Sequence, residues 1–467
     1  MLRYISFFLL LFTVNGTAQE LTLKKGIVMD SLKVNDSISE TFSLFLPKSY
    51  SNETTWPVVF VFEPQGRGRS AAQLFSQGAE EQGYIIIASN NIVAQDSLLN
   101  NLQVAYRVMD TAFNFFPLDQ NRIYTAGFAE GAEVASAIPV VVSNVRGVIA
   151  AGGSWLNPKL LKKGNRFSFI GISGYNDYRI YNLKEAVRLY GRNEHPASLY
   201  TFDGFHEWPG SQLLSRALGS FTLQAMQKGL KPGNPELVEL LYQSELEEAE
   251  RLRRTMHFYK SYELLESMEE KYAIYNKKDE LRSLQKDLRR NSLYRQQKRE
   301  YNNALVLENM KKEEYSYYFE EDVALANFEN IPWWSQQLTE LKKYQEGKNI
   351  AEAEMAYRLQ GFLAAFANSY YTALSQSGAS ADPLVFTAVL QTIFDKKNPA
   401  GYKNIISLSA KDGDYEMAML YLEDLLKTGY KDMEALYDIP GTLDLKLSPE
   451  YNSMIKKYLG KSKFYDL

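Results

Sequence analysis

The chain contains no cysteine, and this absence removes several classes of function at once. Without thiols there is no disulfide, no thiolate metal site, no cysteine nucleophile and no lipoprotein anchor on cysteine. Histidine is also scarce, with three residues: His195, His206 and His257. A histidine-rich metal centre is therefore not expected, and the sequence indicates neither a cofactor nor a bound metal.

An excess of positive charge is missing too. The 467 residues include 52 basic and 56 acidic side chains, which gives a formal net charge of -4. A surface that binds nucleic acid is usually basic, so nucleic-acid binding is not expected as the main function. The hydrophobic content of 45% and the charged content of 23% are ordinary for a globular protein. The length allows two or three domains.

Long apolar runs are absent after the amino terminus. Residues 5–14 are apolar, follow the basic start Met1-Leu-Arg3 and precede the small residues Gly16-Thr-Ala18. This pattern predicts a secretory signal peptide over residues 1–18, with the mature chain starting near Gln19. About twenty apolar residues are needed to span a bilayer, so a retained anchor helix is the weaker alternative. We therefore expect a periplasmic or secreted protein without a membrane span once the signal is cleaved.

Strand and helix patterns alternate over the first half of the chain. Residues 57–62 form a continuous apolar run, which is typical of a parallel strand buried on both faces. Predicted strands cover residues 21–30, 34–46, 57–62, 84–89, 122–126, 147–151, 167–172 and 198–202. Predicted helices cover residues 70–82, with Ser70 as the cap, a segment from Asp96 or Ser97 to 116, and residues 132–141, 183–191 and 211–229. This order predicts an α/β fold with a doubly wound, mostly parallel sheet over residues 19–230.

The pattern changes at Lys231-Pro-Gly-Asn-Pro235, which we interpret as a linker over residues 231–235. From residue 236 to 467 the periodicity is helical and rich in charged residues, so an all-α domain is expected. Residues 402–428 resemble one tetratricopeptide repeat, because a glycine separates two helical segments and a small residue follows it. Residues 257–272 and 351–374 are candidates for further, degenerate helix pairs. An irregular helical bundle is the alternative.

One segment of the first domain has the frame of a catalytic turn. Residues 122–126 are a predicted strand, Gly127-Phe-Ala-Glu-Gly131 is a turn bracketed by glycines, and a helix is predicted from residue 132. Strand, G-x-x-x-G turn and helix make up the nucleophile elbow of α/β-hydrolases, in which the central residue is serine. This chain has Ala129 at the centre. A methyl group cannot attack a carbonyl carbon, so the sequence predicts a hydrolase scaffold that has lost its nucleophile.

Residues 33–229 resemble α/β-hydrolases of the feruloyl-esterase and polyhydroxyalkanoate-depolymerase type. The resemblance is carried by the elbow and by three further segments: Val59-Phe-Val-Phe-Glu-Pro-Gln-Gly66, Gly171-Ile-Ser-Gly-Tyr-Asn-Asp177 and Asp203-Gly-Phe-His-Glu-Trp-Pro209. It implies triad positions at Ala129, Asp177 and His206, in the chain order nucleophile, acid, histidine. Asp203 is the rival for the acid. His195 and His257 are expected to be structural.

The resemblance also implies where an oxyanion would be stabilised. One donor would be the backbone N–H of Glu130, and the other would come from the loop at Gln65 and Gly66. Pro64 has no N–H to offer, and Glu63 is expected to bring negative charge near the place where an oxyanion would form. Both features are unfavourable for stabilising an oxyanion, so they are further evidence against ester hydrolysis by this chain.

Three functional hypotheses follow from these observations. The leading one is an exported, non-catalytic protein of the hydrolase fold, a pseudo-esterase, which binds a small molecule in the vestigial cleft and a protein partner through its helical domain. The first alternative is an active carboxylic-ester hydrolase with an atypical nucleophile, for which Ser154 and Ser173 are candidates. The second alternative is a purely structural protein.

Overall fold

The computed structural model describes residues 23–161 and 167–465. Residues 1–18, the predicted signal peptide, lie outside the described residues. The first half of the chain forms an eight-stranded sheet in the order β1-β2-β4-β3-β5-β6-β7-β8. Its strands are β1 (Val28–Lys33), β2 (Thr41–Phe45), β3 (Trp56–Phe62), β4 (Ile85–Ser89), β5 (Leu118–Phe128), β6 (Val145–Ala151), β7 (Ser168–Gly174) and β8 (Ala197–Phe202).

The sheet is parallel from β4 to β8, whereas β2 runs antiparallel to both β1 and β4. The central strands are apolar on both faces because both faces are covered. Val58 and Phe60 of β3 pack on one face, and Val59 and Val61 pack on the other. The predicted α/β fold class is confirmed, and the strand order is that of an α/β-hydrolase sheet.

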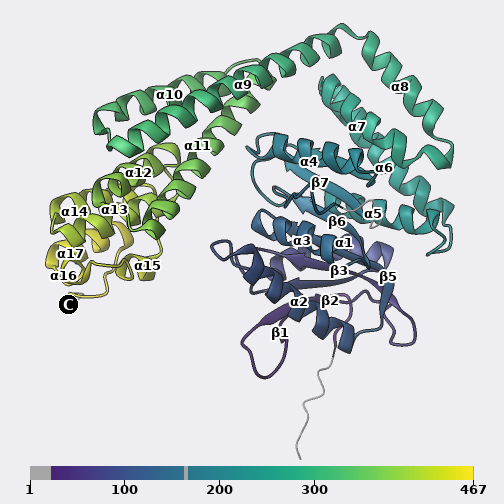
Figure 1. Cartoon of the computed structure of the whole chain (residues 1–467), viewed down its shortest axis with the longest axis horizontal. Coiled ribbons are helices and arrows are strands. Elements are labelled where there is room, and N and C mark those ends of the chain that lie inside the picture. Colours follow the sequence, from purple (N-terminus) through teal and green to yellow (C-terminus); the bar gives the residue numbers. More distant parts are fainter. Residues whose placement is uncertain (1–22, 162–166, 466–467) are drawn as a thin grey trace, which may run out of the picture.

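Five helices cover the sheet, as Figure 1 shows. Helices α2, α3 and α4 pack on one face, and α1 and α5 pack on the other. Their bounds are α1 (Gly68–Gln82), α2 (Leu98–Phe115), α3 (Glu130–Val141), α4 (Ile180–Arg192) and α5 (Ser211–Gln227). Because successive strands are joined through these helices, the carboxyl ends of β3 to β8 lie along one edge of the sheet, where ligands bind in open α/β folds.

The remainder of the described chain is helical, with no strand after Phe202 up to residue 465. We refer to helices α6 to α17 as the helical arm. Its longest members are α9 (Ser292–Leu325) and α11 (Ile350–Ser377). The others are α6 (Pro235–Arg254), α7 (Phe258–Lys271), α8 (Lys278–Arg290), α10 (Ile331–Gln345), α12 (Ala381–Phe394), α13 (Pro399–Asp412), α14 (Tyr415–Lys427), α15 (Met433–Tyr437), α16 (Leu443–Lys446) and α17 (Pro449–Leu459).

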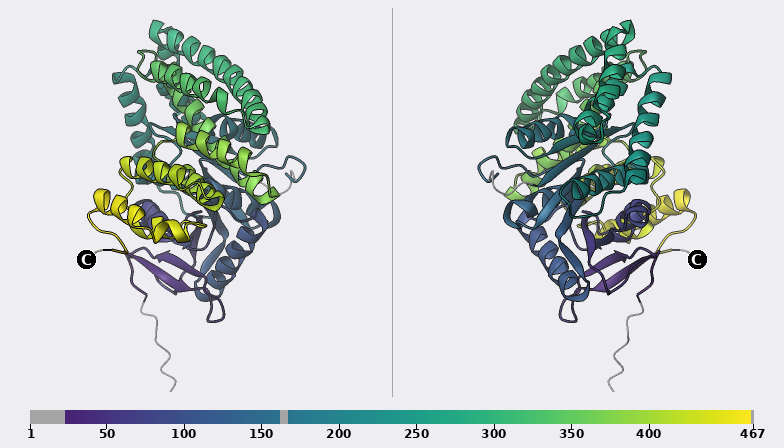
Figure 2. Two further views of the ribbon diagram at one scale, coloured as in Figure 1. Left: turned by 90° about the vertical axis from the view of Figure 1, so that its left-hand side faces the viewer. Right: turned by 90° about the vertical axis from the view of Figure 1, so that its right-hand side faces the viewer.

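The first helices of the helical arm lie beside the sheet, and the later ones lie away from it. Helices α6 and α7 lie next to the β8 side of the sheet, and α9 crosses to the group formed by α10 to α17 (Figure 1). The side views place α9 at the opposite end of the molecule from β1 and β2 (Figure 2). Among the described residues, no helix is long and apolar enough to cross a membrane.

Several local predictions are wrong, each for a physical reason. Helix α1 begins at Gly68, so Ser70 lies inside its first turn and does not cap it. The first strand covers Val28–Lys33, so residues 23–27 of the predicted strand lie outside it, because its partner β2 ends at Phe45, opposite Val28. Residues 351–374 belong to one uninterrupted helix, α11, and residues 258–271 form the single helix α7, so neither segment is a helix pair.

Other predictions agree with the structure. Ser97 caps α2 by accepting the N–H of Asn100 at 3.1 Å. Helix α6 starts at Pro235, one residue before the predicted start of the helical domain, and Asn234 caps it by accepting the N–H of Leu237 at 3.0 Å. A proline at the first helical position costs little, since that N–H has no intrahelical partner. The boundary between a hydrolase-like domain and a helical domain, predicted at residues 231–235, stays a prediction.

Candidate functional site

The turn between β5 and α3 has the strained backbone of a nucleophile elbow. Ala129 adopts φ 50° and ψ -118°, a region that side-chain-bearing residues rarely occupy. Its N–H donates to the carbonyl of Ala151 at 2.9 Å, which ties the turn to β6. Such strain costs about 1–3 kcal/mol and persists only where the surroundings impose it. The elbow is therefore built although its central side chain is a methyl group.

The two glycines of the turn have no room for a side chain. A Cβ on Gly131 would lie 2.1 Å from the carbonyl oxygen of Phe62, and one on Gly127 would lie 2.1 Å from that of Gly131. The G-x-x-x-G spacing read from the sequence thus reflects close contact between α3, β3 and β5.

The structure brings Asp177 and His206 together. Asp177 follows β7, His206 follows β8, and Oδ1 of Asp177 lies 3.1 Å from Nδ1 of His206. The Asp177 side chain is only 1% exposed, and its carboxylate also accepts the N–H of Arg179 at 2.8 Å and the hydroxyl of Ser173 at 3.3 Å. These bonds fix the carboxylate, which in turn orients the imidazole ring.

Asp203, the rival for the acid, and Glu207, the carboxylate next to His206, are occupied elsewhere. Asp203 forms an ion pair with Lys260 at 3.1 Å, and Glu207 accepts the N–H of Phe205 at 3.2 Å. Of the carboxylates near the ring, Asp177 is therefore the one that contacts His206. Its catalytic role, like that of the other two triad positions, stays a prediction.

Ala129 and His206 are linked through the glycines after β6. A Cβ on Gly152 would lie 3.0 Å from Cε1 of His206, and one on Gly153 would lie 2.7 Å from the carbonyl oxygen of Ala129. The ring of Phe128, next to Ala129, lies 4.9 Å from the His206 ring. The three predicted triad positions thus gather at one edge of the sheet, and we refer to Ala129, Asp177 and His206 as the elbow site.

The loop after β3 is closed on itself. The carboxylate of Glu63 is buried and accepts the N–H groups of Gln65 and Arg67, each at 2.9 Å. It also pairs with the Arg67 guanidinium at 3.0 Å, and the N–H of Gly66 donates to the Glu63 carbonyl at 3.3 Å. The N–H groups of Gln65 and Gly66 therefore form hydrogen bonds within the loop. Among the three predicted donors, Glu130 differs, because the first N–H of a helix has no intrahelical acceptor.

The acidic character expected around the elbow is offset by arginines. Arg67 neutralises Glu63, and Arg179 lies 3.6 Å from Glu130 and 3.5 Å from Glu133. Burial raises the pKa of the Glu133 carboxyl, and Arg179 opposes that rise. The sequence analysis missed Arg179. Its only signal was its position two residues after Asp177, in the loop that was already singled out.

The two candidate alternative nucleophiles, Ser173 and Ser154, have different surroundings. The hydroxyl of Ser173 is buried and donates to Asp177 and to the carbonyl of Gly174, both at 3.3 Å. It faces the acid and not the imidazole, so His206 is not placed to remove its proton. Ser154 lies in the loop after β6 and is half-buried.

His195 and His257 have structural surroundings, as expected. His195 is buried between the rings of Phe167 and Tyr190, and its Nδ1 lies 3.1 Å from the carbonyl oxygen of Phe167. His257 contacts the Thr255 hydroxyl at 3.0 Å. Within residues 23–161 and 167–465 no cluster of three or more metal-ligating side chains occurs.

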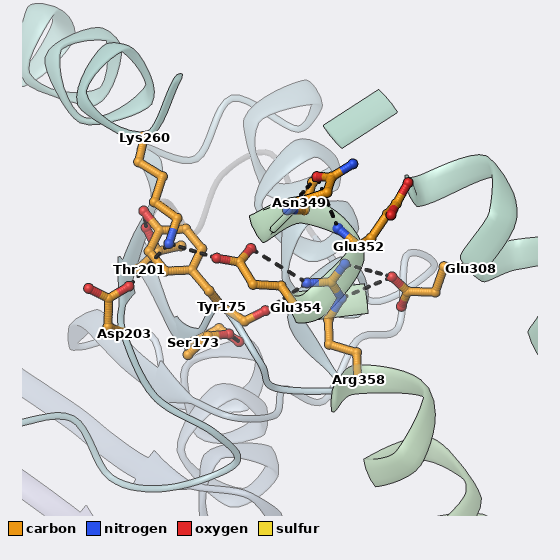
Figure 3. A network of polar contacts seen from close by, with 12 residues as sticks. Ser173, Tyr175, Thr201, Asp203, Lys260, Glu308, Asn349, Glu352, Glu354 and Arg358 are labelled. Atoms are coloured by element: carbon orange, nitrogen blue, oxygen red, sulfur yellow. Dashed lines mark hydrogen bonds and ion pairs between the residues drawn. The ribbon is translucent and has the colours of Figure 1, made fainter. Parts of the chain in front are cut away.

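A buried network of charges joins the helical arm to the loops that carry the elbow site, as Figure 3 shows. Arg358 of α11 donates from Nη1 to the carbonyl of Tyr175 at 2.7 Å and pairs through Nη2 with Glu308 of α9 at 2.8 Å. Lys260 of α7 pairs with Glu354 at 2.7 Å, and its Nζ lies 3.5 Å from the centre of the Tyr175 ring. Tyr175 precedes Asp177 by two residues, so the arm contacts the loop that holds the acid.

A second contact reaches the histidine loop. The ring of Tyr357 on α11 meets that of Phe205 edge to face at 5.3 Å, directly before His206. A Cβ on Gly361, one helical turn further, would lie 3.3 Å from Tyr178, whose ring lies 5.0 Å from that of His206. These contacts join segments about 150 to 180 residues apart, so the local patterns on which sequence reasoning depends could not reveal them. The i, i+4 pair of Glu354 and Arg358 was the one local signal.

Two cavities adjoin this region. The larger, about 590 Å³, lies between β8 and helices α6 and α7. The smaller, about 290 Å³, lies between α4, α7, α9 and α11. Neither is lined by Ala129 or His206.

No known protein-family model matches the chain, and no curated protein matches it. Solved structures match part of it. An esterase from Pyrobaculum calidifontis is 11% identical, with 43% of this chain and 87% of that chain covered and a TM-score of 0.36. FphF, a fluorophosphonate-binding serine hydrolase of Staphylococcus aureus, is 12% identical, with 42% and 97% covered and a TM-score of 0.35. Est1E from Butyrivibrio proteoclasticus is 14% identical, with 43% and 99% covered and a TM-score of 0.34.

These likenesses concern the fold only. The strand order and the all-helical remainder define the class: an α/β-hydrolase domain followed by a helical region.

Proposed function

We propose that this protein is an exported, non-catalytic member of the α/β-hydrolase fold, a pseudo-esterase that acts as a binding adaptor. The observation that carries the proposal is the elbow site: a strained turn at Ala129, whose side chain is a methyl group, and an Asp177–His206 pair at the same edge of the sheet. In a serine hydrolase the histidine removes a proton from the nucleophile's hydroxyl. Here there is no hydroxyl at that position, so His206 has no such proton to remove.

The loop after β3 supports the same proposal. The N–H groups of Gln65 and Gly66 already donate to the carboxylate and the carbonyl of Glu63, so they are not free to bind an oxyanion. A site selected for ester cleavage keeps such donors free, because they stabilise the charge that develops in the transition state. Both the nucleophile and part of the oxyanion machinery are thus altered together.

The helical arm is the proposed partner-binding part. Helices α13 and α14 are separated by Gly413, which has φ 81°, and pack through Ile406 and Ala418. We interpret these two helices as the tetratricopeptide-like pair that the sequence predicts. On α9, the exposed side chains Val306, Met310 and Tyr317 share one helix face at spacings of four and seven residues. We take this stripe as the contact for a protein partner, and the elbow site as the place where a small molecule binds.

An assay with p-nitrophenyl acetate and a feruloyl ester tests the proposal. Wild type and His206→Ala are expected to show the same background rate. Turnover by wild type that disappears in His206→Ala would contradict the non-catalytic proposal.

One observation favours the alternative of an active hydrolase with an atypical nucleophile. The His206 side chain is 26% exposed, and Asp177 still orients it, so the ring could act on a group other than an elbow serine. Ser154→Ala tests this, since Ser154 is the half-buried candidate of the two. Loss of a measured wild-type rate in Ser154→Ala would favour the alternative.

A further inference from the structure

The sheet has an open edge inside the molecule. β8 is the last strand in the order and, within residues 23–161 and 167–465, pairs only with β7. The N–H of Phe169 donates to the carbonyl of Pro196 at 2.8 Å, and that of Tyr175 donates to Phe202 at 2.9 Å. Since bonding to one neighbour alternates along a strand, even-numbered residues of β8 bond to β7, and Ala197, Leu199 and Thr201 direct their main-chain groups the other way.

These outward groups have no partner in the described parts of the chain. None of the hydrogen bonds within residues 23–161 and 167–465 involves the main chain of Ala197, Leu199 or Thr201. An unpaired strand edge is a template for another strand. Three outward residues over about 13 Å present six donors and acceptors in the spacing of an extended chain.

The cavity of about 590 Å³ lies along this edge, and all residues from Pro196 to Asp203 line it. Residues of α4, α5, α6 and α7 line the cavity together with β8. A volume of 300–1,000 Å³ is that of ordinary ligand sites. The surrounding helices therefore keep the edge of another sheet from pairing with β8, whereas a ligand that fits the cavity can reach it. We refer to this cavity along β8 as the slot.

Most charged side chains of the cavity are paired with one another. Arg251 forms two 2.7 Å bonds with Glu248, Lys184 lies 3.4 Å from Glu263, and Lys271 pairs with Glu245. Arg216 of α5 is different. Within the described residues it forms no ion pair, its Nη2 makes one long bond of 3.4 Å to the carbonyl of Ser244, and its Nε is buried without a hydrogen bond.

Glu245, in the wall of the cavity, is also incompletely hydrogen-bonded. Glu245 is 1% exposed, and its Oε2 has no hydrogen-bond partner, although Oε1 contacts Lys271 and the Tyr272 hydroxyl. A buried carboxylate oxygen without a donor is costly. At the other end of the slot, burial first and Arg146 second lower the pKa of Lys228, as expected where cations lack carboxylate partners.

We propose that this slot binds an extended peptide bearing a carboxylate. The main chain of the peptide pairs with Ala197, Leu199 and Thr201, and its carboxylate meets the Arg216 guanidinium. Addition of a strand to a sheet edge is a recurrent mode of peptide recognition, in which main-chain bonds give affinity and side pockets give specificity. The site is separate from the elbow site and does not depend on whether the latter is catalytic.

The first experiment asks whether peptides bind at the edge. The probe is a fluorescein-labelled, C-amidated hexapeptide of alternating valine and glutamate, and a random pool of N-acetylated hexapeptides is added in parallel. We expect saturable binding of the probe and, with probe or pool, slower hydrogen exchange of the amides of residues 197, 199 and 201. Two matched peptides serve as controls: one with N-methylated valines and one with glutamine in place of glutamate. Each is expected to bind at least about tenfold more weakly.

The second experiment places the contacts with paired variants. Leu199→Pro removes one outward N–H without touching the bonds to β7, and proline is tolerated at such an edge position. Leu199→Ala keeps that N–H and controls for the lost side chain. Arg216→Gln is paired with Arg216→Lys, which keeps the charge. We expect about tenfold weaker binding for Leu199→Pro relative to Leu199→Ala, and for Arg216→Gln relative to Arg216→Lys.

His206→Ala separates this site from the elbow site and is expected to leave peptide binding unchanged. The proposal is overturned if neither probe nor pool protects residues 197–201, if N-methylation has no effect, or if His206→Ala abolishes binding. Ester hydrolysis by the wild type would contradict the proposed function while leaving this inference in place.

Discussion

Oδ1 of Asp177 lies 3.1 Å from Nδ1 of His206, beside an elbow whose central residue is Ala129. The Asp177–His206 pair and the strained turn thus occur together with a residue whose side chain is a methyl group. The pair alone can orient an imidazole, but it cannot supply the oxygen that attacks a carbonyl. This combination motivates the catalytic predictions.

Wild-type protein is expected to hydrolyse p-nitrophenyl acetate no faster than the buffer does. Removal of a triad nucleophile costs on the order of a millionfold in kcat. His206→Ala should therefore leave the measured rate unchanged, because the histidine has no hydroxyl to activate at residue 129. Initial rates at several protein concentrations check this, and a rate that rises with wild type but not with the variant would count against the prediction.

Ala129→Ser is expected to restore little activity by itself. The N–H of Gln65 is held at 2.9 Å by the Glu63 carboxylate, so the oxyanion lacks one donor. Loss of one such donor costs about a hundred- to a thousandfold in kcat. Ala129→Ser/Glu63→Ala should therefore exceed Ala129→Ser by at least about tenfold, because Glu63→Ala releases that N–H.

Arg67→Ala is the control for that comparison, since it removes the ion pair with Glu63 and keeps the bond from Gln65. Combined with Ala129→Ser, it should add nothing. Robust turnover by Ala129→Ser alone would show that the loop does not restrict the oxyanion.

Ala129→Gly tests the strain of the elbow. Glycine adopts φ 50° without penalty, and the relief of about 1–3 kcal/mol offsets the lost methyl group and the greater backbone entropy of glycine. The free energy of unfolding should therefore stay within about 1 kcal/mol of wild type. Ala132→Gly, in the ordinary helical turn that follows, should lose about 2 kcal/mol. Urea titrations compare the two, and equal losses would argue against strain at residue 129.

The sequence predicted the elbow site because its signals are local. The glycine spacing around Ala129 reflects contacts within one turn, and Asp177 and His206 each follow a recognisable strand. The state of the oxyanion loop was harder to foresee, because it depends on which way the Glu63 side chain points. Pro64 and the negative charge of Glu63 can be read from the sequence. The hydrogen bonds by which the Glu63 carboxylate closes the loop can be seen only in the structure.

The helical arm shows more clearly which features a hydrophobic pattern does not predict. A 3.6-residue pattern predicted helices after residue 236, and Trp334 is buried in the arm, with its Nε1 2.8 Å from Asp322. The pattern did not show that residues 351–374 form one continuous helix. Nor did it show that Arg358 reaches back to Tyr175, since that contact spans 183 residues.

His257 should make stability depend on pH. Burial first and Lys260 second lower its pKa below the ordinary 6.5. As the pH falls below that value, the unfolded chain takes up a proton that the folded protein resists, so stability is fully present above pH 6.5 and is lost below it. His257→Asn should show a smaller fall in the urea midpoint between about pH 7.5 and about pH 5.5 than wild type. Parallel curves for the two proteins over this range would contradict the prediction.

Removing one partner of the buried ion pair between Arg358 and Glu308 should lower the free energy of unfolding strongly. Replacing both partners should change it little. Arg358 is 2% exposed and Glu308 is 0% exposed, and they lie 2.8 Å apart. Arg358→Met leaves the Glu308 carboxylate buried with Lys312 as its remaining ion-pair partner, at 2.8 Å. Breaking one side of a buried pair costs about 3–5 kcal/mol, whereas replacing both partners with apolar residues of similar volume is often neutral. Arg358→Met/Glu308→Met should therefore recover most of the loss.

Two measurements check this prediction, urea titration for stability and hydrogen exchange for the loop. Arg358→Met also removes the 2.7 Å bond to the Tyr175 carbonyl, so amides of residues 175–179 should exchange faster in both the single and the double variant. Arg282→Met is the control: its ion pair with Glu269 at 2.7 Å is exposed, and such pairs contribute about 0–1 kcal/mol. If stability returns in the double variant while exchange at residues 175–179 stays fast, the arm holds the Asp177 loop through Arg358 itself. If exchange returns to the wild-type rate as well, the bond to Tyr175 does not hold that loop.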